Sequence, residues 1–256
     1  MKNTYFENMT RNDFKNINKQ LIAIIPVASI EQHGAHLPVS TDTIILEYVV
    51  KRAAEICKSE VVIAPIIKYG FSPHHFSFPG VLSLRGETLL KVLIDVGDSL
   101  IRTGFRKILF LTGHGGNSHL AGQAAREMSS SHQDIIALSS SYWDISKNSL
   151  NKLVGDKTDW IPGHAGLVET SMVMAINYSL IDEHELQNYQ GEQKKNDTIL
   201  GKVLNNRSFF ERSNYIGLIN GVSDSPKKAT PEFGCELLTS VVKNMGIFLV
   251  ELYKHP

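Results

Sequence analysis

The stretch Leu21-Ile-Ala-Ile-Ile-Pro-Val-Ala28 leads, two residues later, into Glu31-Gln-His-Gly-Ala-His-Leu-Pro-Val-Ser-Thr-Asp42. The first stretch is a continuous apolar run, too short for a buried helix, and it predicts a buried strand of a parallel sheet. The second places two carboxylates and two imidazoles within twelve residues. A loop that leaves such a strand lies at the crevice where open α/β sheets bind ligands, so we expect this loop to carry the function.

The residue types in this loop favour a metal site. Glu31 and His33 are two apart, so their side chains point to the same side of an extended chain. Asp42 follows after a turn and could complete the set, and this mixture of oxygen and imidazole nitrogen suits Zn²⁺ or Mn²⁺. The alternative is a polar turn whose Asp42 only caps a helix beginning at Thr43. Capping would leave the other polar residues of the loop unexplained.

The composition is that of an ordinary globular protein, with 256 residues, of which 42% are hydrophobic, and zero net charge. Zero net charge argues against a general attraction to nucleic acid or to an anionic membrane. The polar N-terminal residues lack the apolar core of a signal peptide, and no apolar segment is expected to reach the length of a membrane span. The isolated Cys57 and Cys235 are typical of free thiols in a reducing compartment. We therefore expect a cytoplasmic protein with no nucleic-acid or membrane partner.

Short apolar runs alternate with helical patterns, which predicts an α/β fold whose mostly parallel sheet has helices on both faces. The predicted strands are Leu21–Ala28, Val61–Ile67, Lys107–Thr112 and Asp134–Ser140. The predicted helices are Thr43–Lys58, Glu87–Thr103, Asn117–Ser130, Gly166–Leu180 and Pro231–Tyr253. Trp143–Pro162 is expected to be irregular, and Gln190–Asp197 is expected to be an exposed insertion or a subunit-contact loop. Residues 1–256 are expected to form a single domain.

A second loop of the same kind, Gly113-His-Gly-Gly-Asn117, follows the predicted strand Lys107–Thr112. His114 is therefore expected at the same sheet edge as the first loop, where it would be a further metal ligand. The competing interpretation is a nest of backbone N–H groups that holds an anion at a helix N-terminus. The loop has neither the spacing and lysine of a P-loop nor the dinucleotide-binding fingerprint.

Two further segments carry candidate functional histidines. His164 precedes a predicted helix and Glu169 lies in its first turns, an arrangement suited to acid–base catalysis, although a helix dipole alone would favour an acid there. His74 and His75 lie in the loop after the second strand, where they could position a small substrate. Adjacent histidines in a loop are more often simply solvated.

Taken in order, these segments resemble the motifs of the creatininase (creatinine amidohydrolase) family. The matching segments are Glu31–Asp42, Phe78-Pro-Gly80 with Ser83-Leu84, Gly113–Asn117 and His164–Ser171, with a weaker glycine-rich match over Gly217–Gly234. The resemblance implies a three-layer α/β/α fold, two divalent ions (zinc, manganese or a mixture, with Fe²⁺ also possible) and often a homo-hexamer. It implies hydrolysis of a C–N bond in a small amide, lactam or formamide by metal-activated water.

The resemblance also assigns the metal ligands. They are Glu31, His33, Asp42, His114 and Glu169. Asp42 would bridge two ions, the first held also by Glu31 and His114 and the second by His33. Creatininases have a glutamate ligand of the second ion where this chain has Gly116, so Glu169 is the expected substitute. Without that substitute, the second ion would be weakly bound or absent, and the departure weakens the case for creatinine as substrate.

For catalysis, we expect His164 to deliver a proton to the leaving nitrogen, while Glu169 either binds metal or orients this histidine. The expected substrate pocket consists of His36, His74, His75, Asn117 and Trp160. His36 could instead hold the loop from behind the ligands.

Two other functions stay open on the sequence. The first is a family-related deformylase of a pyrimidine nucleotide intermediate, or a metallopeptidase acting on a modified peptide. The second is a non-catalytic α/β protein that binds an anion through the glycine loop, although the acidic residues would repel that anion.

Overall fold

The computed structural model describes residues 4–15, 17–57, 60–158, 161–191 and 220–256. Within them, four strands form a parallel sheet in the order β2-β1-β3-β4. The strands are β1 (Ile22–Val27), β2 (Val61–Ile63), β3 (Lys107–Thr112) and β4 (Ile136–Ser141). All four predicted strands are present, but β2 ends before its predicted limit at Ile67. Pro65 has no N–H for the ladder, and pairing returns only as an isolated bridge between Val27 and Ile67.

Strand β1 shows why the sheet is covered on both faces. Ile22 and Ile24 belong to one buried core, and Ala23 and Ile25 belong to the other. Because side chains alternate along a strand, a strand that is apolar throughout needs a helical layer on each side.

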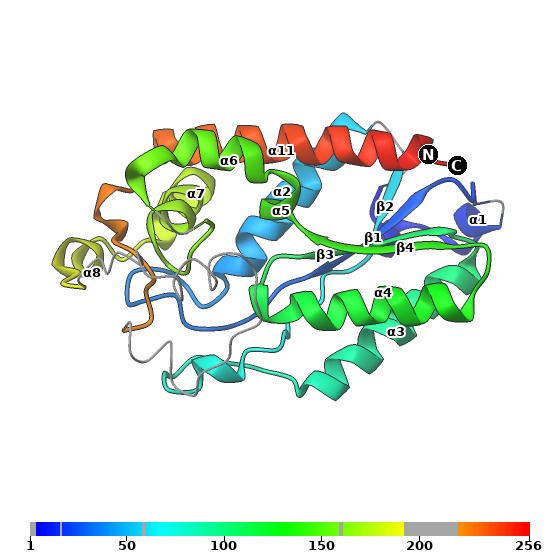
Figure 1. The fold of residues 1–256 in the computed structure, drawn as a ribbon, viewed down its shortest axis with the longest axis horizontal. Helices are drawn as coiled ribbons and strands as arrows, with labels where there is room; N and C mark the ends of the chain where they lie inside the picture. The colour runs from blue at the N-terminus through cyan, green and yellow to red at the C-terminus, as the bar shows by residue number, and fades with distance from the viewer. Residues whose placement is uncertain (1–3, 16, 58–59, 159–160, 192–219) are drawn as a thin grey trace.

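The two helical layers are visible in Figure 1. One contains α2 (Thr41–Ile56), α7 (Leu167–Asn177) and α11 (Pro231–Lys254), which contact one another. The other contains α3 (Gly86–Thr103) and α4 (Ser118–Ser131). The predicted three-layer α/β/α architecture is therefore confirmed.

The segment Trp143–Pro162 was expected to be irregular, and this is wrong for its first half. It contains the end of α5 (Tyr142–Ile145) and all of α6 (Lys147–Val154). Leu150 and Val154, four residues apart, are fully buried on one side of α6. Two buried positions in so short a helix give too weak a periodicity to stand out from the sequence. Short helices α1 (Arg11–Phe14) and α8 (Glu183–Asn188) were not predicted either, and most of Gln190–Asp197 lies outside the described residues.

Helix α11 corrects the expectation that no apolar segment reaches the length of a membrane span. It has 24 residues, and its most apolar 18-residue window has a mean hydropathy of 1.4, so it is long and apolar enough by length and composition alone. Four of its apolar side chains are fully buried at helical spacing: Leu237, Val241, Met245 and Leu249. They face a core shared with α2 and α7, so packing within the fold accounts for this apolar stripe.

The strand order places the functional loops together. From β1 the chain moves to β2 on one side, then returns to β3 on the other side of β1. The loops after β1 and β3 therefore leave from neighbouring carboxyl ends where the winding direction changes, the usual ligand-binding position in open α/β sheets.

Candidate metal centre

The loop after β1 folds back on itself and returns Asp42 to Glu31. The Glu31 N–H donates to the Val39 carbonyl (3.0 Å). Gly34 lies in the turn of the loop with a φ of 66°, a backbone conformation that glycine adopts readily. Helix α2 begins at Thr41 rather than Thr43, so Asp42 lies in its first turn and is not the cap residue. The interpretation of Asp42 as only a helix cap is therefore wrong.

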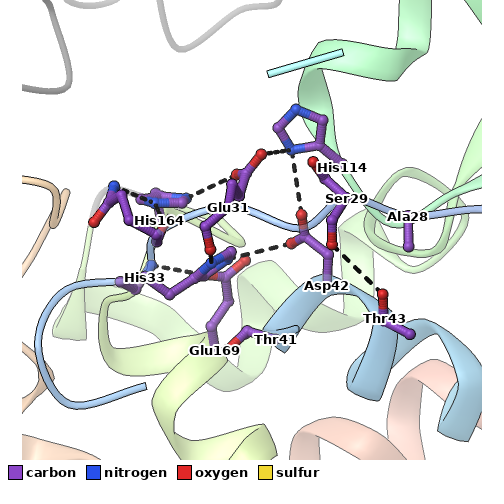
Figure 2. A network of polar contacts seen from close by, with 12 residues as sticks. Ala28, Ser29, Glu31, His33, Thr41, Asp42, Thr43, His114, His164 and Glu169 are labelled. Atoms are coloured by element: carbon purple, nitrogen blue, oxygen red, sulfur yellow. Dashed lines mark hydrogen bonds and ion pairs between the residues drawn. The ribbon is translucent and has the colours of Figure 1, made fainter. Parts of the chain in front are cut away.

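Carboxylates and imidazoles from four segments converge beside this loop (Figure 2). Among the described residues, three overlapping groups could hold a metal ion, each with its facing atoms within 4.8 Å of one another. The groups are Glu31–Asp42–His114, His33–Asp42–Glu169 and Glu31–His33–His164. The expectation that His114 would lie at the same sheet edge as the first loop is confirmed.

Asp42 belongs to two of these groups because its two oxygens face in different directions. Oδ1 lies 3.3 Å from Nε2 of His33, and Oδ2 lies 3.3 Å from Nδ1 of His114. Glu31 Oε2 is 3.1 Å from the same His114 nitrogen, and Glu169 Oε2 is 3.6 Å from the same His33 nitrogen. One carboxylate thus lies between two sets of ligand atoms, as a bridging ligand would.

Several of these short contacts are not aligned as hydrogen bonds. Within the part of the chain that the structure describes, both oxygens of Glu31, together with Asp42 Oδ2 and His33 Nε2, are buried without a hydrogen-bond partner. Leaving such polar atoms unsatisfied is costly unless a cation lies between them. Imidazole nitrogens and carboxylate oxygens are also the donors that zinc and manganese accept, so the residues present fit a divalent ion.

His33 and His114 each have an inner ring nitrogen that faces the carboxylates and an outer one that faces away. The outer nitrogens are bonded as they are in metal-binding imidazoles. His33 Nδ1 lies 3.1 Å from the Glu31 backbone carbonyl, and His114 Nε2 lies 3.1 Å from the Phe71 carbonyl. Each ring therefore donates its outer N–H to a carbonyl. That bond leaves the inner nitrogen free to face the carboxylates with a lone pair.

The charges in the cluster are strongly coupled. Burial would lower the pKa of His33, but Asp42 and Glu169 raise it to about 10. Burial would likewise lower the pKa of His114, but Glu31 and Asp42 raise it well above its ordinary value. Burial would raise the pKa of Glu31, yet His114 holds it well below its ordinary value. Without an ion, protons on the histidines would balance the carboxylates, and a divalent cation would have to displace them.

Two more histidines flank Glu31. His75 Nε2 lies 3.1 Å from Glu31 Oε1, and His164 Nδ1 lies 3.7 Å from the same oxygen. Burial lowers the pKa of His75 to about 2, and burial together with nearby His33 lowers the pKa of His164 to about 3. Burial therefore favours the neutral form of both rings. His74 stacks on His114, with ring centroids 5.6 Å apart.

The other expected pocket residues hold loops in place. Asn117 Oδ1 accepts the N–H of Phe71 (2.9 Å), and its amide nitrogen donates to the carbonyl of Ala28 (2.9 Å). His36 Nε2 lies 2.9 Å from Thr170 Oγ1, and both residues are buried. Trp160 lies outside the described residues.

Sequence reasoning assigned no role to Ser223 and Asp224, which support His164. The His164 N–H donates to Ser223 Oγ (2.7 Å), and Ser223 N–H donates to the His164 carbonyl (2.9 Å). Asp224 Oδ2 accepts the N–H of Leu167 at the start of α7 (3.2 Å). The only sequence signal was the weak glycine-rich match over Gly217–Gly234, which pointed to no single residue.

The creatininase family model, described as creatinine amidohydrolase, matches residues 7–249. A creatinine amidohydrolase from Pseudomonas putida is 31% identical over 174 residues, or 63% of this chain and 66% of that protein. A mycofactocin precursor peptide peptidase from Mycolicibacterium smegmatis is 31% identical over 61% of this chain and 58% of that protein. A 3-dehydro-scyllo-inosose hydrolase from Thermotoga maritima is 35% identical over 43% of this chain and 36% of that protein. The matched segments thus span less than two thirds of each of these relatives.

Solved structures agree with the fold. A creatinine amidohydrolase structure superimposes with a TM-score of 0.79, at 23% identity and with 100% of both chains covered. A Zn–Zn form of a creatininase variant and a manganese form of creatininase give TM-scores of 0.77 and 0.74 at 24% identity, each covering 98% of this chain and 99% of the other.

Proposed function

The chain belongs to the creatininase family, whose members are hydrolases, and we propose that it is a metal-dependent amidohydrolase that cleaves a C–N bond of a small molecule. The observation that carries the proposal is the position of Asp42 between His33 and His114, in a buried cluster with unpaired ligand atoms. A cluster of this kind at the carboxyl edge of a sheet is what metal-assisted hydrolysis requires.

In this proposal Glu31, Asp42 and His114 hold one ion, and His33, Asp42 and Glu169 hold the other. Zinc or manganese is the proposed metal, as in the structurally similar creatininases. When bound, the ions would polarise the substrate carbonyl and lower the pKa of a water molecule. The contact of Glu169 with His33 supports a place for Glu169 in the second site, which Gly116 leaves without the glutamate that creatininases have there.

His164 is the proposed proton-transfer residue. Its Nε2–H donates to the Gln32 backbone carbonyl (2.8 Å), so its Nδ1 is a free acceptor facing the centre. A neutral imidazole in that position can take a proton from water and pass it to the leaving nitrogen. Glu169 Oε2 also accepts the N–H of Ala165 (2.6 Å), which holds the backbone next to His164.

A larger substrate is the second candidate. The peptidase relative is as similar to this chain as the creatinine amidohydrolase, at 31% identity for each. A peptide, or the formamide of a pyrimidine nucleotide, would be cleaved by the same arrangement of residues.

We further propose that the enzyme is cytoplasmic. We also propose that it assembles as a homo-oligomer, because the resemblance implies a hexamer.

The test is a substrate panel combined with metal analysis. Zinc-loaded and manganese-loaded protein would be assayed with creatinine, formamidopyrimidine nucleotides and short peptides. Turnover of at least one that disappears after chelation and returns with metal supports the proposal. Phosphate binding that survives chelation, with no tightly bound metal and no turnover, would instead support an anion-binding protein.

A further inference from the structure

Gln32 lies between two proposed metal ligands in the sequence. Among the described residues, its side chain makes polar contacts with His75, His164, Gly34 and Gly221, none of which is a carboxylate. Its Oε1 accepts the N–H of Gly34 (2.9 Å). This bond decides which end of the amide is oxygen and which is nitrogen. Nε2 then lies 3.0 Å from His75 Nδ1 and 3.2 Å from the Gly221 carbonyl. Both hydrogens of the amide nitrogen are thereby used.

The contact with the amide fixes the proton of the His75 ring. An amide nitrogen only donates, so His75 Nδ1 has to accept and cannot carry a proton. The ring keeps at least one proton, which is therefore on Nε2. That nitrogen lies 3.1 Å from Glu31 Oε1, so His75 presents an N–H group to the centre.

The backbone carbonyl of Gln32 determines which ring nitrogen of His164 carries a proton, and here the nitrogen that faces the centre is the unprotonated one. The Gln32 carbonyl accepts the Nε2–H of His164 (2.8 Å), so in the neutral ring the lone pair is on Nδ1. Gln32 Nε2 is also 3.0 Å from His164 Nε2, but both atoms are donors here and make no bond with each other. His164 thus presents a lone pair to the centre, 3.7 Å from the Glu31 oxygen that His75 also faces.

We propose that Gln32 is a positioning residue that makes His75 a hydrogen-bond donor and His164 a proton acceptor on either side of Glu31. The chemical meaning of this pair rests on the proposed function. Hydrolysis of an amide needs an acceptor for the proton of water and benefits from a donor near the carbonyl oxygen, where negative charge develops. The proton on His75 Nε2 also keeps this nitrogen out of the set of metal ligands.

The experiment reads the ring protons directly. Solid-state ¹⁵N spectra of [¹⁵N]histidine-labelled, zinc-loaded protein at pH 7 distinguish protonated from unprotonated ring nitrogens. Spectra of His75→Gln and His164→Gln assign the two rings by the signals that disappear. We expect both rings of the unmodified protein to be protonated at Nε2 only.

Gln32→Glu then replaces the donating nitrogen with an accepting oxygen. We expect Nδ1 of His75 to gain a proton in this variant, while His164 is unchanged because it bonds to the backbone of residue 32. Gln20→Glu, at an exposed position with the same change of charge, should leave both rings as they were.

A His75 ring protonated at Nδ1 in the unmodified protein would overturn the proposal even if Gln32→Glu failed to fold. A His164 ring protonated at Nδ1 would do the same. An unchanged His75 in folded Gln32→Glu would also overturn it. Zinc titration of the unmodified protein is a separate readout: failure to bind zinc contradicts the proposed function, and the ring protons are then read from the zinc-free protein.

Discussion

Oδ1 of Asp42 lies 3.3 Å from Nε2 of His33, and both side chains are buried. Nδ1 of His33 is bonded to a backbone carbonyl, and among the described residues Nε2 faces the carboxylates without a hydrogen-bond partner. The other oxygen of this carboxylate, Asp42 Oδ2, lies 3.3 Å from Nδ1 of His114. The cluster is therefore organised around one carboxylate, and the predictions below follow from that arrangement.

Replacing His164 with alanine should leave the metal content near that of the unmodified protein and lower kcat by about 10²–10⁴, the usual contribution of a positioned acid–base group. Metal analysis and steady-state kinetics on an identified substrate check this. His184→Ala is the control, because the His184 side chain is 80% exposed. Loss of metal in His164→Ala, with activity restored by excess ion, would make His164 a ligand through its group with Glu31 and His33.

Replacing Glu169 with glutamine should lower metal occupancy by about one ion per chain, and Glu31→Gln should empty the other position. The amide keeps the shape of the side chain but loses the negative charge that offsets the desolvation of a divalent ion. Calorimetric titration with zinc measures both sites. Full second-site occupancy in Glu169→Gln would leave Glu169 with its bond to Ala165 as an orienting residue only.

Gly116→Ala should weaken zinc binding by about 10–100-fold, the usual effect of disturbing a partner behind a metal ligand. A Cβ at Gly116 would collide with the Phe71 carbonyl and the His114 ring, which are hydrogen-bonded to each other. A glutamate at this position, as in creatininases, would meet the same obstacle. Gly115→Ala is a matched control, because a Cβ there meets no atom of the described residues within 4 Å. Equal zinc affinities for the two variants would contradict this account of Gly116.

Lys107→Met should lower the free energy of unfolding by about 2 kcal/mol, the scale of hydrogen bonds to a charged group. The buried Lys107 ammonium donates to the carbonyls of Leu252 (3.1 Å) and Tyr253 (2.7 Å), and also to that of His255, at the C-terminal end of α11. Methionine keeps the apolar stem but leaves these carbonyls without the donor. Urea denaturation measures the loss, and Lys91→Met on the exposed side of α3 is the control. Equal stabilities would show that the contacts contribute nothing.

The sequence predicted the strands, the long helices and the meeting of the first two loops, because apolar runs and loop positions are local features of the chain. It did not predict α6, whose two buried residues are too few for a clear pattern. It also left Gln32 without a role, although this residue lies inside the most informative motif. Apart from Gly34, the partners of Gln32 are His75 and Gly221 through its side chain and His164 through its backbone carbonyl. All three are distant in the sequence, and no local pattern carries information about such contacts.

The most direct test of the central claim, that two divalent ions share Asp42, is the metal content of Asp42→Ala. Unmodified protein and variant would be loaded with zinc, dialysed and analysed for metal per chain, with circular dichroism to confirm that the variant is folded. We expect about two ions per chain in the unmodified protein, and a larger loss in Asp42→Ala than in Glu31→Gln or Glu169→Gln, because only Asp42 would serve both sites. Full metal content with unchanged affinity in folded Asp42→Ala would contradict the binuclear centre.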